Sequence, residues 1–168
     1  THNRMSQNAP VNVKDVGAVG DDVADVTAAI TSALVSGAVV YIPKGTYKIT
    51  SSISLNDVTD LFVFGDGEQS KLVYEVSGGA DMLVVSSGNP IKRSVFRDLC
   101  FFYATTTNGA PALTFNQSED VLIENCVFDR CQLKLKLATR ANVFSNLVKN
   151  YHSNRSGIVV ANATDCII

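Results

Sequence analysis

The sequence lacks features that mark several common functional classes. Tryptophan, the residue that stacks most often on sugars, is absent, and the net charge of −2 lacks the basic excess typical of nucleic-acid binders. No apolar run reaches the roughly 18 residues of a membrane span. The N-terminal THNRMSQNAP is polar and has no apolar signal-peptide core. We therefore expect no membrane insertion and no nucleic-acid partner.

Metal-binding cysteine motifs are also missing. The four cysteines, Cys100, Cys126, Cys131 and Cys166, include no CxxC pair, so their spacing fits no zinc site. We expect reduced cysteines packed as small hydrophobic residues, with no metal and no cofactor. A disulfide between Cys126 and Cys131 is the alternative.

What is present indicates one folded domain with a single helix. Of 168 residues, 46% are hydrophobic and 18% charged, which suits a globular core. Apolar residues spaced by three and four, such as Val26, Ala29 and Ala33, predict a helix over 25–36 that ends before Gly37. Alternation predicts strands over 11–14, 38–43 and 44–49. We divide the chain into a lead-in (1–10), an N-terminal cap (11–50) and repeated coils (51–168).

A repeat of about 22 residues occupies the second half. An Asp or Asn followed by an apolar strand recurs at Asp98, Asp120, Asn142 and Asp165, in steps of about 22 residues. A second strand series, ALTFN, KLKLA and GIVVA, has the same step. Two series with one period and no helix predict a parallel β-helix, with about three short strands in each coil.

The repeat also predicts which side chains stack. We expect one inward column of Leu113, Leu135 and Ile158, and another of Phe115, Leu137 and Val160. Thr114 and Lys136 would alternate outward. A third, looser series places Asn125 and Asn146 as a ladder at a coil corner. A β-sandwich would not give one step in two strand series, and a leucine-rich repeat would need a consensus that is absent.

The N-terminal half resembles the signature of the pectate-lyase-like superfamily of right-handed β-helices. The segments that carry the resemblance are VNVKDVGAVGDDVADVTAAI (11–30), VVYIPKGTYKI (39–49) and DLFVFGDG (60–67). This superfamily includes phage tailspikes and many polysaccharide lyases and hydrolases. The resemblance implies an all-β, single-stranded right-handed parallel β-helix with an N-terminal capping helix. It bears on the fold more than on the activity.

The acidic turn around Asp21 and Asp22 departs from the usual pattern of this superfamily. It predicts a cap over the N-terminal end of the β-helix rather than a ligand-binding loop. Asp22 replaces a turn glycine, and Ala24 replaces a threonine that could cap the helix. Asp22 or Asp25 must then accept hydrogen bonds from the first helical N–H groups. A helix over the first coil would cover its apolar end, and negative charge suits the helix N-terminus. The predicted cap residues are Asp15, Gly17, Gly20, Asp21, Asp22 and Asp25.

Catalytic residues are hard to assign. Carboxylates on one outer face could converge, and the candidates are Glu119, Asp120, Glu124, Asp129 and Asp165. Asp120 and Asp165 share a repeat position with Asn142, which favours turn formation. Glu124 and Asp129 are therefore the catalytic candidates, across a possible corner, with solvated surface carboxylates as the alternative. The polygalacturonase signature and the acidic calcium cluster of pectate lyases are not recognisable.

Two segments are candidates for contact with carbohydrate. Lys134 and Lys136 face outward in the expected strand LKLKL and, with Arg140, form the basic stripe. They could meet an acidic polysaccharide or a neighbouring subunit, or simply be solvated. The loop NYHSNR offers Tyr151, His152 and Arg155, with an ordinary corner loop as the alternative.

The resemblance implies three functions. The first is a segment of a phage tailspike or tail fibre: a homotrimer in the virion tail that binds or cleaves bacterial surface polysaccharide. Its N-terminal side would contact other tail proteins, and the reduced cysteines suit cytoplasmic assembly. The second is a secreted microbial polysaccharide lyase or hydrolase, and the third a non-enzymatic adhesion or structural module. Because Ile168 ends the sequence inside a coil, we expect a longer parent whose catalytic residues lie beyond it.

Overall fold

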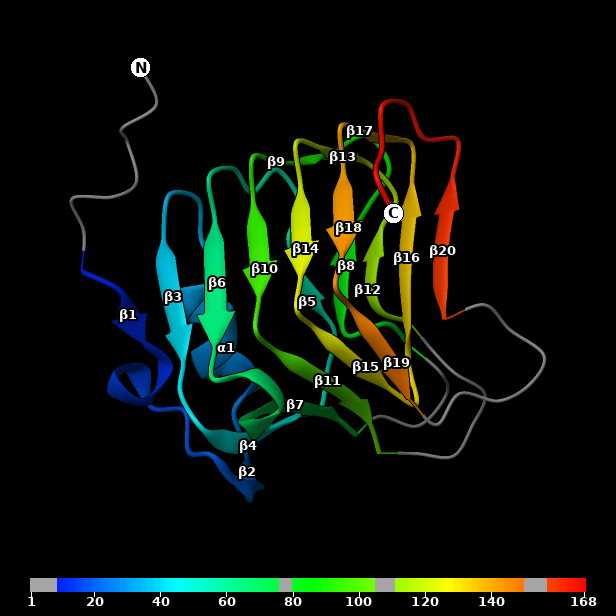
Figure 1. Ribbon diagram of the computed structural model, residues 1–168. Coiled ribbons are helices and arrows are strands. Elements are labelled where there is room, and N and C mark those ends of the chain that lie inside the picture. Colours follow the sequence, from blue (N-terminus) through cyan, green and yellow to red (C-terminus); the bar gives the residue numbers. More distant parts are fainter. Residues whose placement is uncertain (1–8, 76–79, 105–110, 150–156) are drawn as a thin grey trace.

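The computed structural model describes residues 9–75, 80–104, 111–149 and 157–168. The chain winds as a parallel β-helix, which confirms the predicted fold class. Its strands form four parallel sheets, named A to D here, in which each strand pairs with its counterparts in neighbouring coils. In Figure 1 the strands of sheet A stand side by side in chain order, from blue β1 to orange β18.

Sheets A and B contain six strands each. Sheet A comprises β1 (Val11–Asn12), β3 (Val39–Ile42), β6 (Phe62–Gly65), β10 (Val95–Arg97), β14 (Leu122–Glu124) and β18 (Asn142–Phe144). Sheet B comprises β2 (Asp21–Asp25), β4 (Gly45–Ile49), β7 (Ser70–Tyr74), β11 (Cys100–Tyr103), β15 (Val127–Asp129) and β19 (Leu147–Lys149). Strands of A lead into strands of B through short corners.

Sheets C and D complete each coil. Sheet C comprises β5 (Ile53–Ser54), β8 (Leu83–Val85), β12 (Pro111–Phe115), β16 (Gln132–Lys136) and β20 (Ile158–Ala161). Sheet D comprises the two-residue strands β9 (Ile91–Lys92), β13 (Ser118–Glu119) and β17 (Ala138–Thr139). A full coil therefore has four strands where three were predicted, because the last side is divided by a bend.

The core is a set of inward columns that alternate with outward residues. Phe96 and Phe115 pack with ring centroids 5.6 Å apart, and Phe101 stacks on Phe128 at 5.4 Å. All four rings are fully buried. Burial of this aromatic area stabilises the core at roughly 25 cal/mol per Å² of apolar surface.

The register corrects two predicted columns. Leu133, not Leu135, lies between Leu113 and Ile158, while Leu135 lies between Phe115 and Val160. Leu137 has a left-handed backbone and a side chain 48% exposed, so it belongs to no column. The physical reason is a tight corner between β15 and β16. It gives this coil 20 residues, from Leu113 to Leu133, where the sequence predicted 22.

Thr114 also departs from the prediction. It lies opposite Lys134 rather than Lys136, and it is 4% exposed although it faces away from the columns. Lys134 and Lys136 do alternate with the buried Leu133 and Leu135, as the sequence indicated.

The corner between sheets D and A is a column of left-handed residues. Positive φ angles occur at equivalent positions in Asp60, Arg93, Asp120, Arg140 and Asp165. Asp120 and Asp165 are thus at one position, but Asn142 lies two residues further on, within β18. Asp98 occupies the other corner, between A and B, together with Asn125 and Ser145.

The predicted asparagine ladder is therefore wrong. Asn125 lies opposite Ser145, and Asn146 instead links neighbouring coils through their backbones. Its Oδ1 accepts from the Cys126 N–H at 2.9 Å, and its Nδ2 donates to the Ile123 carbonyl at 2.9 Å.

The N-terminal end is closed by short elements. The 3₁₀ helix η1 (Val13–Val16) follows β1, and α1 (Thr27–Ala33) follows β2; a second 3₁₀ helix, η2 (Gly67–Gln69), lies after β6. Helix α1 buries Ile30 and Ala33 in the core. It is shorter than the predicted 25–36, because Asp25 pairs in β2 with Lys48 and the helix ends at Leu34.

All four cysteines are free thiols, which confirms the reduced state and excludes the Cys126–Cys131 alternative in this structure. Burial raises the pKa of Cys100 to about 11 and that of Cys126 to about 12. Such thiols act as small hydrophobic groups rather than as nucleophiles.

Candidate functional site: a hollow on the outer face of sheet B

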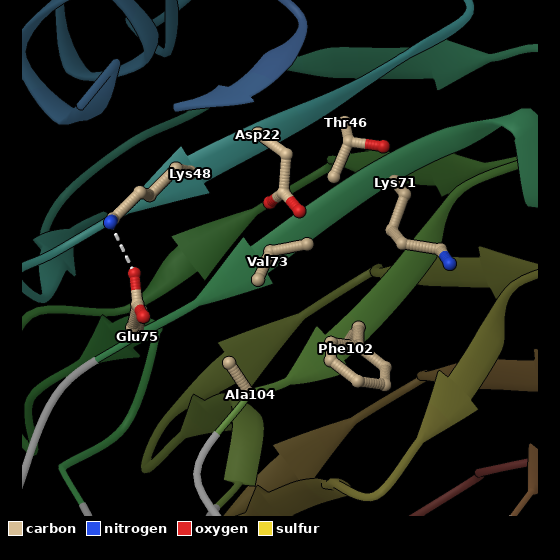
Figure 2. Close-up of a pocket in the computed structure, with 8 residues that line it drawn as sticks. All are labelled: Asp22, Thr46, Lys48, Lys71, Val73, Glu75, Phe102 and Ala104. Carbon is tan, nitrogen blue, oxygen red and sulfur yellow. Dashed lines mark ion pairs between the residues drawn. The ribbon is translucent and has the colours of Figure 1, made fainter. Parts of the chain in front are cut away.

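The outward side chains of sheet B, called the B face here, surround a shallow hollow of about 360 Å³. Four consecutive strands, β2, β4, β7 and β11, contribute to it, so residues far apart in sequence meet (Figure 2). The lining residues are Asp22, Thr46, Lys48, Lys71, Val73, Glu75, Phe102 and Ala104.

Strand register explains how this set converges. Thr46 lies opposite Lys71, and Val73 lies opposite Phe102. Each alternates with an inward residue such as Leu72 or Phe101, so the outward side chains form rows about 4.8 Å apart along the helix axis. Rows of this kind give a groove that matches a linear ligand.

Phe102 is the aromatic centre of the B face. Lys71 Nζ lies 5.4 Å from the ring centroid, and the Arg130 guanidinium carbon lies 5.3 Å from it. The ring is half-buried, and both cations lie over it. Figure 2 shows Lys71 and Phe102 on the same side of the hollow.

An ion pair bounds the other side. Lys48 and Glu75 contact each other through Nζ and a carboxylate oxygen (dashed in Figure 2), and the hydrogen bond that Lys48 donates to Glu75 raises the pKa of Lys48. Asp22 enters the hollow between the two lysines from a left-handed backbone (φ 64°). The hollow thus combines two ammonium groups, two carboxylates, one hydroxyl and one aromatic ring, an arrangement suited to binding polyhydroxylated molecules.

The catalytic candidates Glu124 and Asp129 lie on different sheets. Glu124 ends β14 in sheet A, where it forms an ion pair with Arg97 and is 8% exposed. Asp129 ends β15 on the B face, opposite Phe102 and Lys149. The predicted pairing of these carboxylates is not formed, because the corner between them separates the two faces.

The basic candidates also lie apart from the hollow. Lys134 and Lys136 project from β16 on the outer face of sheet C. Arg140 lies at the corner between sheets D and A. Tyr151, His152 and Arg155 lie outside the described residues.

The predicted cap residues gather at the N-terminal end. Asp15 is exposed in η1, and Gly17 has the left-handed backbone that ends it. A Cβ on Gly20 would lie 3.0 Å from Gly45 Cα, so this close approach favours glycine. Asp22 does adopt the glycine-like backbone, but it faces the hollow instead of the helix.

Two of these aspartates make local hydrogen bonds. Asp21 accepts from Val23 and Ala24, and Asp25 accepts from the Thr27 N–H at 3.0 Å and the Thr50 hydroxyl at 2.6 Å. The bonds from Ala24 and Val23 lower the pKa of Asp21, and a bond from the Thr27 hydroxyl, followed by that from Thr50, lowers the pKa of Asp25. Asp25, rather than Asp22, thus supplies the oxygen near the first turn of α1.

Sequence reasoning missed Lys71 and Phe102. Phe102 lies in the apolar run CFFY, in which periodicity does not reveal which aromatic ring faces outward. Lys71, in SKLVY, was the available signal, since a lysine alternating with apolar residues marks an outward position.

Among the described residues, no cluster of three or more His, Cys, Asp or Glu side chains could hold a metal ion. Within the same ranges, no helix has the length and apolar character needed to cross a membrane.

The comparison with family models shows to which protein family the chain belongs. The model described as rhamnogalacturonase A/epimerase, pectate lyase-like, matches residues 10–166. The chain belongs to this pectate-lyase-like family. The resemblance seen in the N-terminal segments is thus confirmed over nearly the whole chain. No curated protein sequence matches it significantly.

Two solved structures share the pectate-lyase-like fold. ORF18 of Geobacillus virus E2 superposes with a TM-score of 0.67 at 20% identity over 94% of this chain. The catalytic unit of a thermostable GH87 α-1,3-glucanase from Streptomyces thermodiastaticus strain HF3-3 gives 0.65 at 17% identity over 94%. The chain spans about a third of their lengths, 35% and 31%.

Proposed function

We propose that this pectate-lyase-like chain is a polysaccharide-binding β-helix and that the hollow on the B face contacts the glycan. The observation that carries the proposal is the partly exposed Phe102 ring, with the Lys71 and Arg130 cations over it, on the face that holds the hollow. The part of the ring that these cations leave uncovered contacts the C–H groups of a sugar in this proposal. The lysines and carboxylates provide donors and acceptors for its hydroxyls.

The geometry favours binding over catalysis within this chain. Lys48 and Glu75 already form an ion pair with each other. The candidate acids Glu124 and Asp129 lie on different sheets. Hydrolysis or lyase chemistry needs a pair of positioned groups around one bond. Any depolymerase activity is therefore proposed for the parent protein, with this chain contributing part of its binding surface.

A phage tailspike or tail fibre is the parent that we favour. The similarity in fold to a Geobacillus virus protein and the reduced cysteines support it. In this proposal the parent is a homotrimer in the virion tail, bound to other tail proteins through its N-terminal side. The similarity in fold to a glucanase supports the alternative, a secreted polysaccharide-degrading enzyme.

The proposed function is tested by measuring binding to a panel of bacterial capsules and O-antigens. Affinity electrophoresis and calorimetry measure this binding. Phe102→Ala should weaken binding by about tenfold, since an aromatic contact contributes roughly 0.5–1.5 kcal/mol beyond its buried area. Lys71→Ala should weaken it as well. The double variant Lys134→Ala/Lys136→Ala, on another face, is the matched control and should bind normally.

Two results would contradict this assignment. Loss of binding in the Lys134→Ala/Lys136→Ala variant with normal binding by Phe102→Ala would place the glycan on sheet C. Failure to bind any glycan of the panel would oppose the binding function itself. Release of reducing ends or of unsaturated products by the full-length parent would then distinguish hydrolase from lyase.

A further inference from the structure

The outer side of sheet A, called the A face here, has a composition unlike the other faces. Its outward residues include a contiguous apolar set: Val39, Tyr41, Phe62, Phe64, Val95 and Leu122. All of them are partly exposed. Each alternates with a buried residue of the core, so the exposure follows from the strand geometry and not from a local irregularity.

Aromatic rings form the centre of the A face. Tyr41 stacks on Phe64 with centroids 5.1 Å apart, and Phe62 stacks beside Phe64 at 5.3 Å. The faces of these rings are largely occupied by one another. The face therefore presents apolar ring edges, which suits a packed protein surface better than a stacked sugar.

The charges within the A face are already paired. Arg97 lies over the Phe62 ring, with its guanidinium carbon 5.8 Å from the centroid, and forms an ion pair with Glu124. The Glu124 side chain is only 11% exposed. Burial of this face by a partner would leave neither charge uncompensated, which avoids the main cost of covering charged residues.

Lysine is absent from the strands of sheet A, whereas the other long sheets carry it. Lys48, Lys71 and Lys149 project from sheet B, and Lys134 and Lys136 from sheet C. Interface centres are enriched in Tyr, Phe and Arg and depleted in Lys. Sheet A alone has this pattern among the described strands of the three long sheets.

We propose that the A face is the contact between copies of this chain, with the A faces of neighbouring copies turned toward one another. Contact of the A face with sheet B or C of a neighbour would bury lysines against aromatic rings. Contact with another A face buries apolar groups and one internally paired Arg97–Glu124 on each side. A second copy is therefore the occupant that the charge pattern favours.

The mass of the whole chain in solution tests the proposal, by light scattering and sedimentation over a range of concentrations. The wild type should associate beyond its monomer mass of 18.0 kDa as concentration rises. Phe64→Lys should weaken association at least tenfold, because it places an unpaired charge at the centre. Phe102→Lys, the same change on the B face, is the matched control and should associate like the wild type.

A second variant distinguishes loss of the interface from loss of folding. Leu122→Lys, two coils further along the same face, should also give a folded monomer by circular dichroism. A wild type that stays monomeric at every concentration would overturn the proposal. So would an oligomer that persists in both folded variants, or a monomer whose glycan binding is lost in Phe64→Lys.

Discussion

Arg140 and Asp120 hold two successive coils together although both residues have left-handed backbones. Arg140 Nε donates to Asp120 Oδ1 at 2.6 Å, and Nη2 donates to Oδ2 at 2.8 Å. Arg93 makes the same two-pronged contact with Asp60, at 2.8 and 2.9 Å. The corner column thus alternates in charge from Asp60 to Asp165, which makes equivalent positions in consecutive coils attract one another.

The pH dependence of stability should reveal this charge column. Hydrogen bonds from Lys92 and then Arg140 lower the pKa of Glu119, and that from Arg140 lowers the pKa of Asp120. Lowered folded-state pKa values stabilise the protein above the ordinary values of 4.5 and 3.8, and this stabilisation is lost as pH falls from those values through the lowered folded-state pKa values.

We therefore expect Arg140→Gln to lower the urea midpoint at about pH 7 and to have little effect at about pH 2. High salt should shrink the difference at neutral pH, because both groups are exposed. An equal loss at both pH values would show that Arg140 acts through packing and not through charge.

Ser118 should be replaceable by alanine with a gain in stability. It is 1% exposed, its hydroxyl has no hydrogen-bond partner, and it lies between Ile91 and Ala138 of the neighbouring coils. Removing a buried unpaired hydroxyl should raise the free energy of unfolding by about 1 kcal/mol, measured by urea denaturation.

Ser94→Ala is the matched control for this prediction. Ser94 is fully buried, but its hydroxyl donates to the Lys92 carbonyl at 2.8 Å and accepts from the Leu61 N–H at 3.3 Å. Its loss should cost about 1–2 kcal/mol. If Ser118→Ala destabilises as much as Ser94→Ala, the Ser118 hydroxyl is satisfied in solution.

Asp25→Ala should destabilise the N-terminal end. Its carboxylate accepts from Thr27 at the start of α1 and from Thr50 after β4, so it joins the helix to the second coil. We expect a loss of about 1–2 kcal/mol in the free energy of unfolding. Asp15→Ala, an exposed aspartate in η1, is the control and should change the thermal midpoint very little.

Deletion of residues 11–37 tests whether this segment acts as a cap. The deletion removes β1, β2 and α1, and it uncovers the edges of β3 and β4 together with Val40 and Tyr47. Open strand edges with apolar side chains favour aggregation, which light scattering would detect. A soluble, folded product that does not aggregate would instead show that the segment is not needed as a cap. Removal of residues 1–8 alone is the control.

The fold was predictable because short apolar strands between polar corners, with no helical pattern in the second half, leave few alternatives. The predicted step of about 22 residues was wrong: on sheet A the step is 33 residues from Phe62 to Val95, 27 from Val95 to Leu122 and 20 from Leu122 to Asn142.

The exact register was not predictable, since Asp98 and Asp120 stand at different corners but look alike in the sequence. Both take left-handed backbones, which aspartate tolerates, so residue type cannot identify the corner. Treating Asn142 as the equivalent of Asp120, although Arg140 holds that position, shifted the Leu113 and Phe115 columns by two residues in the next coil.

The hollow could not be derived from the sequence for a related reason. Whether Phe101 or Phe102 faces outward depends on the register of β11 with β7, and the run CFFY contains no polar residue to settle it. Glu124 and Asp129 are close in sequence, but a corner separates them onto different faces. Proximity across coils follows only from the pairing of strands.

The most direct test of the account is a map of the glycan contact by two-dimensional ¹⁵N–¹H NMR. A bound glycan should shift the signals of Thr46, Lys71, Val73 and Phe102 on three adjacent strands of sheet B. The signals of Lys134 and Lys136 should stay in place. Shifts centred on β16, with the B-face signals unchanged, would contradict the assignment of the hollow as the binding site.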